Sequence, residues 1–302
     1  MKSSMTVPRR LTLAAAPIAA LVLLVGVASG AQAATAVGLG NANSFVVLAG
    51  AGVTNTGTTT LSGDLGAANG SVIGDTDLVF TSGSNHYGDG VTTGAMVDLE
   101  AAFGAASQTA DVTVSADLGG QNLVPGVYFQ AGPMNLSGPA LTLDAGGNPD
   151  AVWIFRAGSS LIVGPGATVN LVNGAQACNV FWQVASSASL DDGADLVGTV
   201  IARTSITLNA AATVQGRVLA LDGTVTMINN TITRPVCAAA PPPAGDGGGG
   251  PQVTSVPTGS VATGDGSTSL RSFDSFLLAA GVVGIGAAAV TVASRWHRRR
   301  TA

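Results

Sequence analysis

Between residues 34 and 237 the chain alternates short apolar and small polar residues, with glycine between the runs. Such alternation predicts many short β-strands, because successive side chains of a strand point to opposite faces. In the second half of this segment one polar–apolar–polar pattern recurs at nearly constant intervals, in Ser187–Leu190, Ser205–Leu208 and Thr224–Met227. A short repeat that contains several strands is typical of the coils of a β-helix.

A second pattern recurs beside the first and, over its last three copies, with the same interval. It is found in Thr168–Asn170, Asp195–Val197, Thr213–Gln215 and Thr231–Thr233, each with an apolar residue in the middle. The middle residue is expected to point into the coil and its neighbours outward, so that outward residues of successive coils form ladders about 4.8 Å apart. A β-sandwich is the rival fold, but it gives no reason for a repeat of this kind.

The outward positions of the first pattern all carry hydroxyl groups. A rigid array of small hydroxyl and methyl groups at regular spacing could order water into a lattice-like layer. Threonine also suits exposed β-positions in any sheet, and this plainer interpretation stays open. The candidate binding residues in these two ladders are Ser187, Ser189, Ser205, Thr207, Thr224 and Thr226.

One segment departs from the strand pattern. Residues 94–110 place Met96, Leu99, Phe103 and Ala106 at helical spacing, with Thr93 available as the N-cap. We therefore predict one amphipathic helix, packed against the strands.

Four large aromatic residues follow in the second half of the segment. We expect them on the remaining side of the coils, at least partly inside. They are Trp153, Phe155, Phe181 and Trp182.

The N-terminal segment, 1–33, has the three-part layout of a secretory signal peptide. Basic residues up to Arg10 precede an apolar run from Leu11 to Val27, and the small-residue pattern Ala31–Ala33 offers a cleavage site. We expect cleavage after Ala33; an uncleaved membrane anchor is the alternative.

The part of the chain that follows Cys237 predicts a surface anchor. Residues 238–275 form a Pro/Gly/Ser-rich linker, residues 276–293 an uncharged stretch long enough for a transmembrane helix, and residues 294–302 a basic cytoplasmic tail. A buried core helix is the alternative for the apolar stretch.

Within the linker, one short motif, followed by the apolar run and the arginines, resembles a loose variant of a sortase sorting signal. Its residues are Val261, Ala262, Thr263 and Gly264. Sortase would cut after Thr263 and join the chain to the cell wall; otherwise the helix holds it in the membrane. Both cases predict an exported protein displayed at the cell surface.

The charge of the segment 34–237 limits the classes of partner that it is expected to bind. It holds 14 acidic residues, four arginines and no lysine, a formal net charge of −10. Such a surface repels nucleic acid and anionic lipid, so neither is an expected partner.

The same segment contains two cysteines, Cys178 and Cys237, which suggest a disulfide in an exported chain. This disulfide would contribute roughly 4 kcal/mol to the free energy of unfolding. Two unpaired thiols remain the alternative.

The segment 34–237 contains few of the side chains that catalysis commonly uses. It has one histidine, His86, and one glutamate, Glu100, and shows no Ser-His-Asp or metal-ligand spacing. Asp191 and Asp192 could touch a calcium ion but fall short of the six or more oxygens that it prefers. A polysaccharide lyase on a β-helix is thus disfavoured, and we expect no enzyme activity, cofactor or metal.

Many short motifs, in the same order along Val37–Cys237, are similar to those of the microbial ice-binding proteins of the DUF3494 type. They include Ser44–Gly50, Thr54–Gly57, Gly63–Gly66, Pro125–Tyr128, Asn173–Val184, Gly198–Val200, Ser205–Leu208 and Asn229–Thr233. The resemblance implies a chain dominated by β-structure, a right-handed β-helix (solenoid) with one long α-helix packed alongside. It also implies ice, or ordered water, as the partner.

The chain departs from the family at one pattern. Some members repeat Thr-Ala/Gly-x-Thr/Asn on their ice-binding face, whereas the matching stretches here are Pro165–Thr168, Asp192–Asp195 and Ala210–Thr213. Asp191, Asp192 and Asp195 add hydrated charge, which disfavours strong antifreeze activity. A structural or adhesive cell-wall protein on the same fold is therefore the second hypothesis, since fold alone does not fix function.

Overall fold

A computed structural model describes residues 34–110 and 112–238. The predicted signal peptide, sorting motif, transmembrane segment and basic tail lie outside the described residues, as does all of the linker after Ala238. Within the described ranges no helix is long and apolar enough to cross a membrane. The described residues lie in one compact unit with its own hydrophobic core. Residues 34–238 can therefore be studied as an independent domain.

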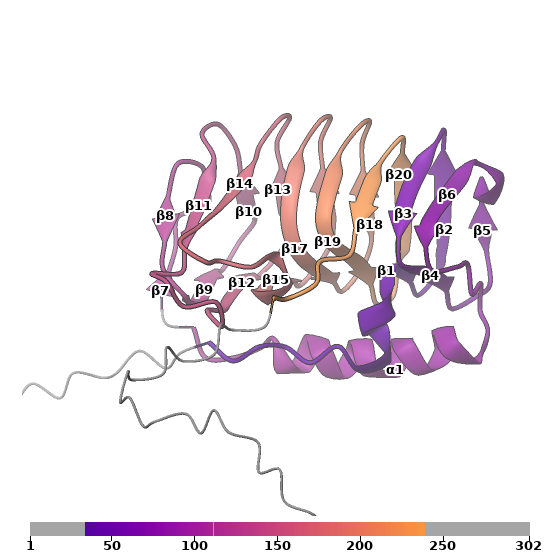
Figure 1. Ribbon diagram of the computed structural model, residues 1–302, viewed down its shortest axis with the longest axis horizontal. Helices are drawn as coiled ribbons and strands as arrows, with labels where there is room; N and C mark the ends of the chain where they lie inside the picture. The colour runs from indigo at the N-terminus through magenta and orange to yellow at the C-terminus, as the bar shows by residue number, and fades with distance from the viewer. Residues whose placement is uncertain (1–33, 111, 239–302) are drawn as a thin grey trace, which may run out of the picture. The chain divides into compact units, whose positions relative to one another are not determined.

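The domain is a stack of β-coils whose strand pairs are all parallel (Figure 1). One sheet contains seven strands, in the order β10 (Met134–Leu136), β13 (Leu161–Val163), β16 (Ala188–Leu190), β18 (Ile206–Leu208), β20 (Thr224–Ile228), β2 (Gly52–Thr56) and β5 (Val72–Ile73). A small sheet contains β14 (Val169–Val172), β11 (Leu141–Asp144) and β8 (Asn122–Leu123).

The largest sheet has eleven strands. Its main path is β6 (Leu78–Ser82), β3 (Thr59–Ser62), β21 (Thr231–Thr233), β19 (Thr213–Ala220), β17 (Asp195–Ala202), β15 (Val180–Val184), β12 (Trp153–Ala157), β9 (Gly126–Gln130) and β7 (Val112–Thr113). Beside this path, β1 (Phe45–Ala49) pairs with β19, and β4 (Asp64–Ala67) pairs with β1. The short helices are η1 (Gly40–Ser44), η2 (Asp75–Asp77) and η3 (Ala177–Asn179).

Both sequence repeats are in the predicted register. Ser189 lies opposite Thr207, and Thr207 opposite Thr226, while Leu196, Val214 and Ile232 stack at the core position of the second pattern. One repeat is therefore one coil. The prediction of a β-helix is confirmed, and the β-sandwich is wrong, because its antiparallel sheets would not stack identical positions in this way.

The order of the coils along the stack differs from their order in sequence. The coils nearest the N-terminus do not start the stack; β1 pairs with β19, β2 with β20 and β3 with β21. After β6, the helix α1 (Gly90–Ala105) runs back along the stack, and the chain starts again at the other end with β7 (Figure 1). The N-terminal coils thus cover the exposed edge that the last coil would leave, which protects it from edge pairing.

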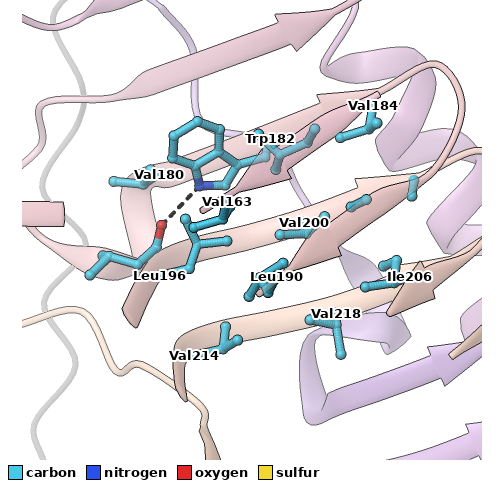
Figure 2. Packing of buried hydrophobic residues seen from close by; sticks show 14 of the residues in the cluster. Val163, Val180, Trp182, Val184, Leu190, Leu196, Val200, Ile206, Val214 and Val218 are labelled. Atoms are coloured by element: carbon cyan, nitrogen blue, oxygen red, sulfur yellow. Dashed lines mark hydrogen bonds between the residues drawn. The ribbon is translucent and has the colours of Figure 1, made fainter. Parts of the chain in front are cut away.

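The interior of the coils is apolar and tightly filled. Tyr128, Phe155 and Trp182 from three successive coils stack in one column, with ring centroids 5.4 and 4.2 Å apart. The Nε1–H of Trp182 donates to the carbonyl of Val197 at 2.9 Å, so its polar atom is satisfied inside the core (Figure 2). Trp153 also lies inside, whereas Phe181 points out of the coil toward α1.

The helix begins and ends earlier than the predicted range 94–110. Asp89, not Thr93, is the N-cap, and its carboxylate accepts the N–H of Thr92 at 2.9 Å. This hydrogen bond and one to His86 lower the pKa of Asp89, so the cap is charged at neutral pH. The predicted start was wrong because Asp89 caps the helix, which therefore begins at Gly90.

Helix α1 covers the outer side of the large sheet. Its buried stripe is Thr92, Ala95, Leu99 and Ala102, while the predicted contact residues Met96 and Phe103 are only half-buried. The stripe packs against outward apolar residues of the sheet, among them Phe45, Leu48, Ile154, Phe181, Ile201 and Leu219. Alanine at the contact positions lets the helix approach the sheet closely.

The predicted disulfide between Cys178 and Cys237 is present, with Cα atoms 5.7 Å apart. It ties the last described residues to η3 across a sequence separation of 59 residues. We expect Cys178→Ser with Cys237→Ser to lower the free energy of unfolding by about 2–4 kcal/mol, because the unfolded chain regains the freedom of that loop. Urea unfolding of both forms measures this, and an unchanged midpoint would contradict it.

Two stacked glycines allow β17 and β19 to turn from one face of the stack to the next. Gly198 lies opposite Gly216, and a Cβ on Gly216 would lie 1.7 Å from the carbonyl oxygen of Gly198. Because the backbone carbonyl of Gly198 cannot move away without straining the sheet, Gly216→Ala should lower the free energy of unfolding by about 1–3 kcal/mol. Gly132→Ala is the control, because a Cβ there would have no neighbour within 4 Å and its φ lies outside the left-handed region. Equal stability of Gly216→Ala and the parent in thermal unfolding would refute this.

Candidate functional site

Three faces of the stack differ in what they offer to solvent. The helix-covered face, formed by β1, β4, β9, β12, β15 and the second halves of β17 and β19, lies under α1. The seven-strand face is the outer side of β10, β13, β16, β18, β20, β2 and β5. The third face is formed by β8, β11, β14, the first halves of β17 and β19, and β21, β3 and β6.

A single column of outward side chains runs along the middle of the seven-strand face. Each strand contributes one residue, in unbroken register, so neighbours are about 4.8 Å apart. Along the stack the central column is Asn135, Ile162, Ser189, Thr207, Thr226, Thr54 and Ile73. Within it, Thr207, Thr226 and Thr54 place three threonines side by side.

Buried residues on both sides hold the central column in place. Ile206 and Leu208 flank Thr207, and Val225 and Met227 flank Thr226; all four are fully buried. A strand anchored by two core side chains around one outward residue has little freedom to move. The hydroxyls of Thr207, Thr226 and Thr54 form no hydrogen bond with any other residue that the structure describes, so they remain available to water.

The other three predicted residues lie in a side column and serve the fold. Ser187 Oγ is 2.7 Å from Thr204 Oγ1 and also accepts the N–H of Ser205 at 3.4 Å. Ser205 Oγ accepts the N–H of Thr224 at 3.2 Å. These hydroxyls link successive coils and have less capacity for an external partner than the central column.

Thr54 belongs to the candidate surface but was absent from the sequence-based set. It comes from the N-terminal coils and lies next to Thr226 only because β2 pairs with β20. The one signal that could have found it is the shared Val-Thr pair, Val53-Thr54 matching Val225-Thr226.

Two of the three acidic residues that the sequence placed near this surface, Asp191 and Asp192, lie at its margin, directly after β16. Asp191 Oδ1 accepts from Asn209 Nδ2 at 3.1 Å, and Asp192 Oδ1 accepts the N–H of Ala210 at 3.0 Å. Both carboxylates therefore bridge to the next coil. Asp195 lies on the third face, where it accepts from Thr213 Oγ1 at 2.7 Å.

The third face also carries threonines, but its surface is hollowed. A groove of about 270 Å³ runs among Asp195, Thr213, Gln215, Thr231 and Thr233. A carboxylate and a hollow both work against a flat, uncharged contact with an ordered lattice. The seven-strand face is the better candidate for such a contact.

The single histidine of the domain has structural partners. Its Nδ1 lies 3.0 Å from Asp89 Oδ2 and its Nε2 lies 3.5 Å from Asp64 Oδ1, at the start of α1. Among the described residues there is no cluster of three histidine, cysteine or carboxylate side chains that could hold a metal ion. His86 thus links the helix cap to β4.

Known proteins are similar to this chain in sequence. The family model described as ice-binding-like matches residues 47–233. An ice-binding protein of Nostoc sp. (strain HG1) is 38% identical over 207 residues, which cover 67% of this chain and 76% of the relative. An ice-binding protein of Colwellia sp is 31% identical over 227 residues, covering 66% and 84%.

Solved structures are also similar to this chain in fold. The crystal structure of an ice-binding protein from an Antarctic biological consortium has a TM-score of 0.65 and 40% identity, over 67% of this chain and 92% of that one. That of the ice-binding protein from the Antarctic ascomycete Antarctomyces psychrotrophicus has a TM-score of 0.64 and 39% identity, over 66% and 98%. With the matched family region spanning most of the β-helix, this chain belongs to the ice-binding-like family.

Proposed function

We propose that this protein adsorbs to ice through its seven-strand face. The observation that carries the proposal is the central column, in which Thr207, Thr226 and Thr54 occupy three adjacent coils with free hydroxyls. Each threonine offers a methyl group, which favours ordered water around it, and a hydroxyl, which can join that water by hydrogen bonds. Because the spacing is set by the β-ladder, the ordered water would be held in register with the protein.

Isoleucines on both sides of the hydroxyl-bearing residues in the central column limit the strength of ice adsorption that we expect. Ile162 and Ile73 are 40% and 61% exposed and offer no hydroxyl, so the threonine array is short. Asp191 adds a charge beside Ser189, which is 3.4 Å away. We therefore propose moderate ice adsorption rather than strong antifreeze activity.

Export and anchoring form a second part of the proposal. The signal peptide (1–33) delivers the chain across the membrane, and the segment 276–293 with its basic tail holds it at the envelope. A protein fixed to the cell surface would attach the cell to ice rather than protect its interior. Cell fractionation tests this: the protein should be in the envelope fraction, and recovery from the cytosol would contradict it.

The sorting motif decides between a wall linkage and a membrane anchor. If sortase joins the chain to the wall after Thr263, Thr263→Ala should shift the protein from the wall fraction to the membrane fraction. If the apolar segment is the anchor, this variant should leave the distribution unchanged and deletion of 276–293 should release the protein.

The second candidate is an adhesive or structural surface protein. The acidic domain, with its net charge of −10, and its predicted linker and anchor suit contact with another surface. Partition into slowly growing ice separates the two functions. An ice-adsorbing domain should be enriched in the solid phase over an acidic control protein of similar size, whereas equal exclusion of both proteins would favour the adhesive function.

A further inference from the structure

The four arginines of the domain fall into two pairs with different environments. Arg203 forms an ion pair with Glu100 through contacts of 2.9 and 3.1 Å, and Arg156 donates to Gln183 Oε1 at 3.0 Å and to the carbonyl of Gln108. Arg203 therefore holds α1 against the stack, and Arg156 holds the segment that follows the helix. Arg217 and Arg234 instead line one pocket, and neither forms an ion pair with a carboxylate of the residues that the structure describes.

This pocket has a volume of about 480 Å³ and lies between the first and last described segments of the chain. Asn43, Arg217 and Arg234 make up its strongly polar part, and the disulfide forms part of its wall. The rest of the lining is largely apolar and consists of Val37, Gly38, Leu39, Phe181, Pro235 and Val236. The pocket therefore combines cationic and apolar surface.

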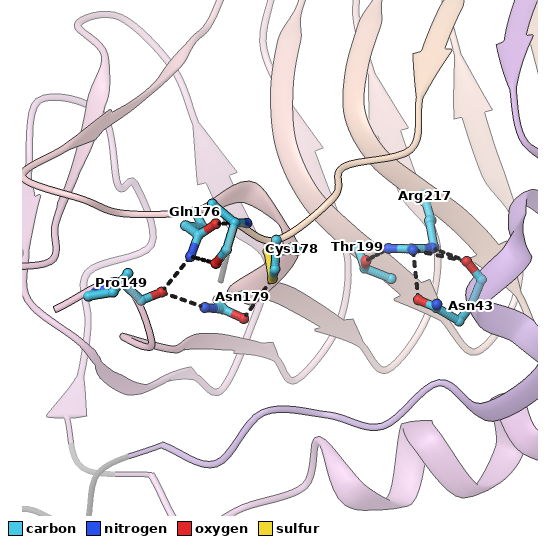
Figure 3. The surroundings of a disulfide bond; sticks show 9 residues. Asn43, Pro149, Gln176, Cys178, Asn179, Thr199 and Arg217 are labelled. Atoms are coloured by element: carbon cyan, nitrogen blue, oxygen red, sulfur yellow. Dashed lines mark hydrogen bonds between the residues drawn. A yellow bond between two sulfur atoms is a disulfide. The ribbon is translucent and has the colours of Figure 1, made fainter. Parts of the chain in front are cut away.

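Arg217 is a buried cation whose contacts are all with neutral groups. Its side chain is buried, with 3% of the residue exposed. Nε and Nη2 donate to the carbonyl of Asn43 at 3.1 and 2.9 Å, and Nη2 also donates to Asn43 Oδ1 at 2.8 Å. Nη1 has only a long contact, 3.4 Å to Thr199 Oγ1, which leaves one of the five guanidinium N–H groups without a partner (Figure 3).

Arg234 places a second positive charge close by. Burial, together with the charge of Arg234, lowers the pKa of Arg217 to about 10, so Arg217 still carries its charge at neutral pH. The guanidinium of Arg234 forms no hydrogen bond with any described residue. Two like charges facing one pocket are unfavourable unless an anion lies between them.

We propose that this pocket binds a small organic anion, a carboxylate with an apolar body. Arg217 and Arg234 would bind the carboxylate oxygens with charge-assisted hydrogen bonds, and Phe181, Leu39 and Pro235 would contact the apolar body. The apolar lining distinguishes this ligand class from sulfate or phosphate, which would leave that surface unfilled. The pocket includes none of the central-column residues, so this site is separate from the proposed ice contact.

Calorimetric titration of residues 34–238, with the disulfide intact, tests the proposal. The probes are benzoate, the neutral benzyl alcohol, and sulfate. Benzoate should bind saturably and raise the melting temperature, whereas benzyl alcohol and sulfate should each bind at least about tenfold more weakly, a difference of about one charge-assisted hydrogen bond.

Variants at three arginines complete the test. Arg234→Gln should weaken benzoate binding about tenfold, and the matched control Arg203→Gln, outside the pocket, should leave it unchanged. Arg217→Lys keeps the charge but loses the planar fork, so it should weaken binding while the domain stays folded. Absence of saturable benzoate binding, equal binding of benzyl alcohol, equal binding of sulfate, or an unaltered Arg234→Gln variant would each overturn the assignment.

Discussion

Thr207→Tyr combined with Thr226→Tyr is expected to abolish both ice-crystal shaping and thermal hysteresis. The two residues lie opposite each other on β18 and β20, in the middle of the central column. A tyrosine ring projects well beyond the hydroxyl and methyl groups of threonine, so two of them would lift the seven-strand face away from a flat lattice. Their outward direction keeps the core intact, and circular dichroism should show the parent β-structure.

The matched control for this variant is Thr231→Tyr with Thr60→Tyr. These threonines are also neighbours in register, on β21 and β3, but they belong to the third face. The control should keep the parent's hysteresis, because the same change in size and polarity is made away from the proposed contact. Loss of activity in the control but not in the Thr207 and Thr226 variant would move the binding surface to the third face.

Trp182→Ala is expected to cause the largest loss of stability, about 3–5 kcal/mol. The side chain is 1% exposed and stacks on Phe155 with ring centroids 4.2 Å apart. Its removal leaves a cavity in the middle of the stack and deprives the carbonyl of Val197 of its donor. Guanidinium unfolding followed by circular dichroism measures the change.

Trp182→Phe is the graded comparison for that variant. It keeps an aromatic ring against Phe155 but lacks the Nε1–H that bonds to Val197. It should therefore lose clearly less stability than Trp182→Ala. If Trp182→Ala lowers the free energy of unfolding by less than about 1 kcal/mol, the stacked rings of Tyr128, Phe155 and Trp182 do not stabilise the β-helix as expected.

The coil repeat could be predicted from sequence because it is a local, periodic signal. Each ladder position recurs at a nearly constant interval with the same polarity, as Ser189, Thr207 and Thr226 do, and the structure has these positions in register. The stacking of β2 on β20 could not be predicted in this way. It joins Thr54 to Thr226 across a long stretch of chain, and no period connects the two segments. For the same reason the sequence pattern could not predict the hydrogen bonds between Arg217 and Asn43.

The hydroxyl groups of the six candidate residues show a second limit of prediction from sequence. Alternation predicts which side chains point outward, and all six predicted residues belong to the predicted coils. It does not predict which of them already have partners. Ser205 lies where the chain turns, and its Oγ accepts the N–H of Thr224, whereas Thr207 lies mid-strand and remains free. That distinction depends on the backbone path at the corner of the coil.

Growth of a single ice crystal in a solution of purified residues 34–238 tests most directly whether this β-helix binds ice. We expect a faceted crystal and a gap between the melting and freezing temperatures that widens with protein concentration. A round crystal that grows freely at high protein concentration would contradict ice binding and favour an adhesive or structural role at the cell surface.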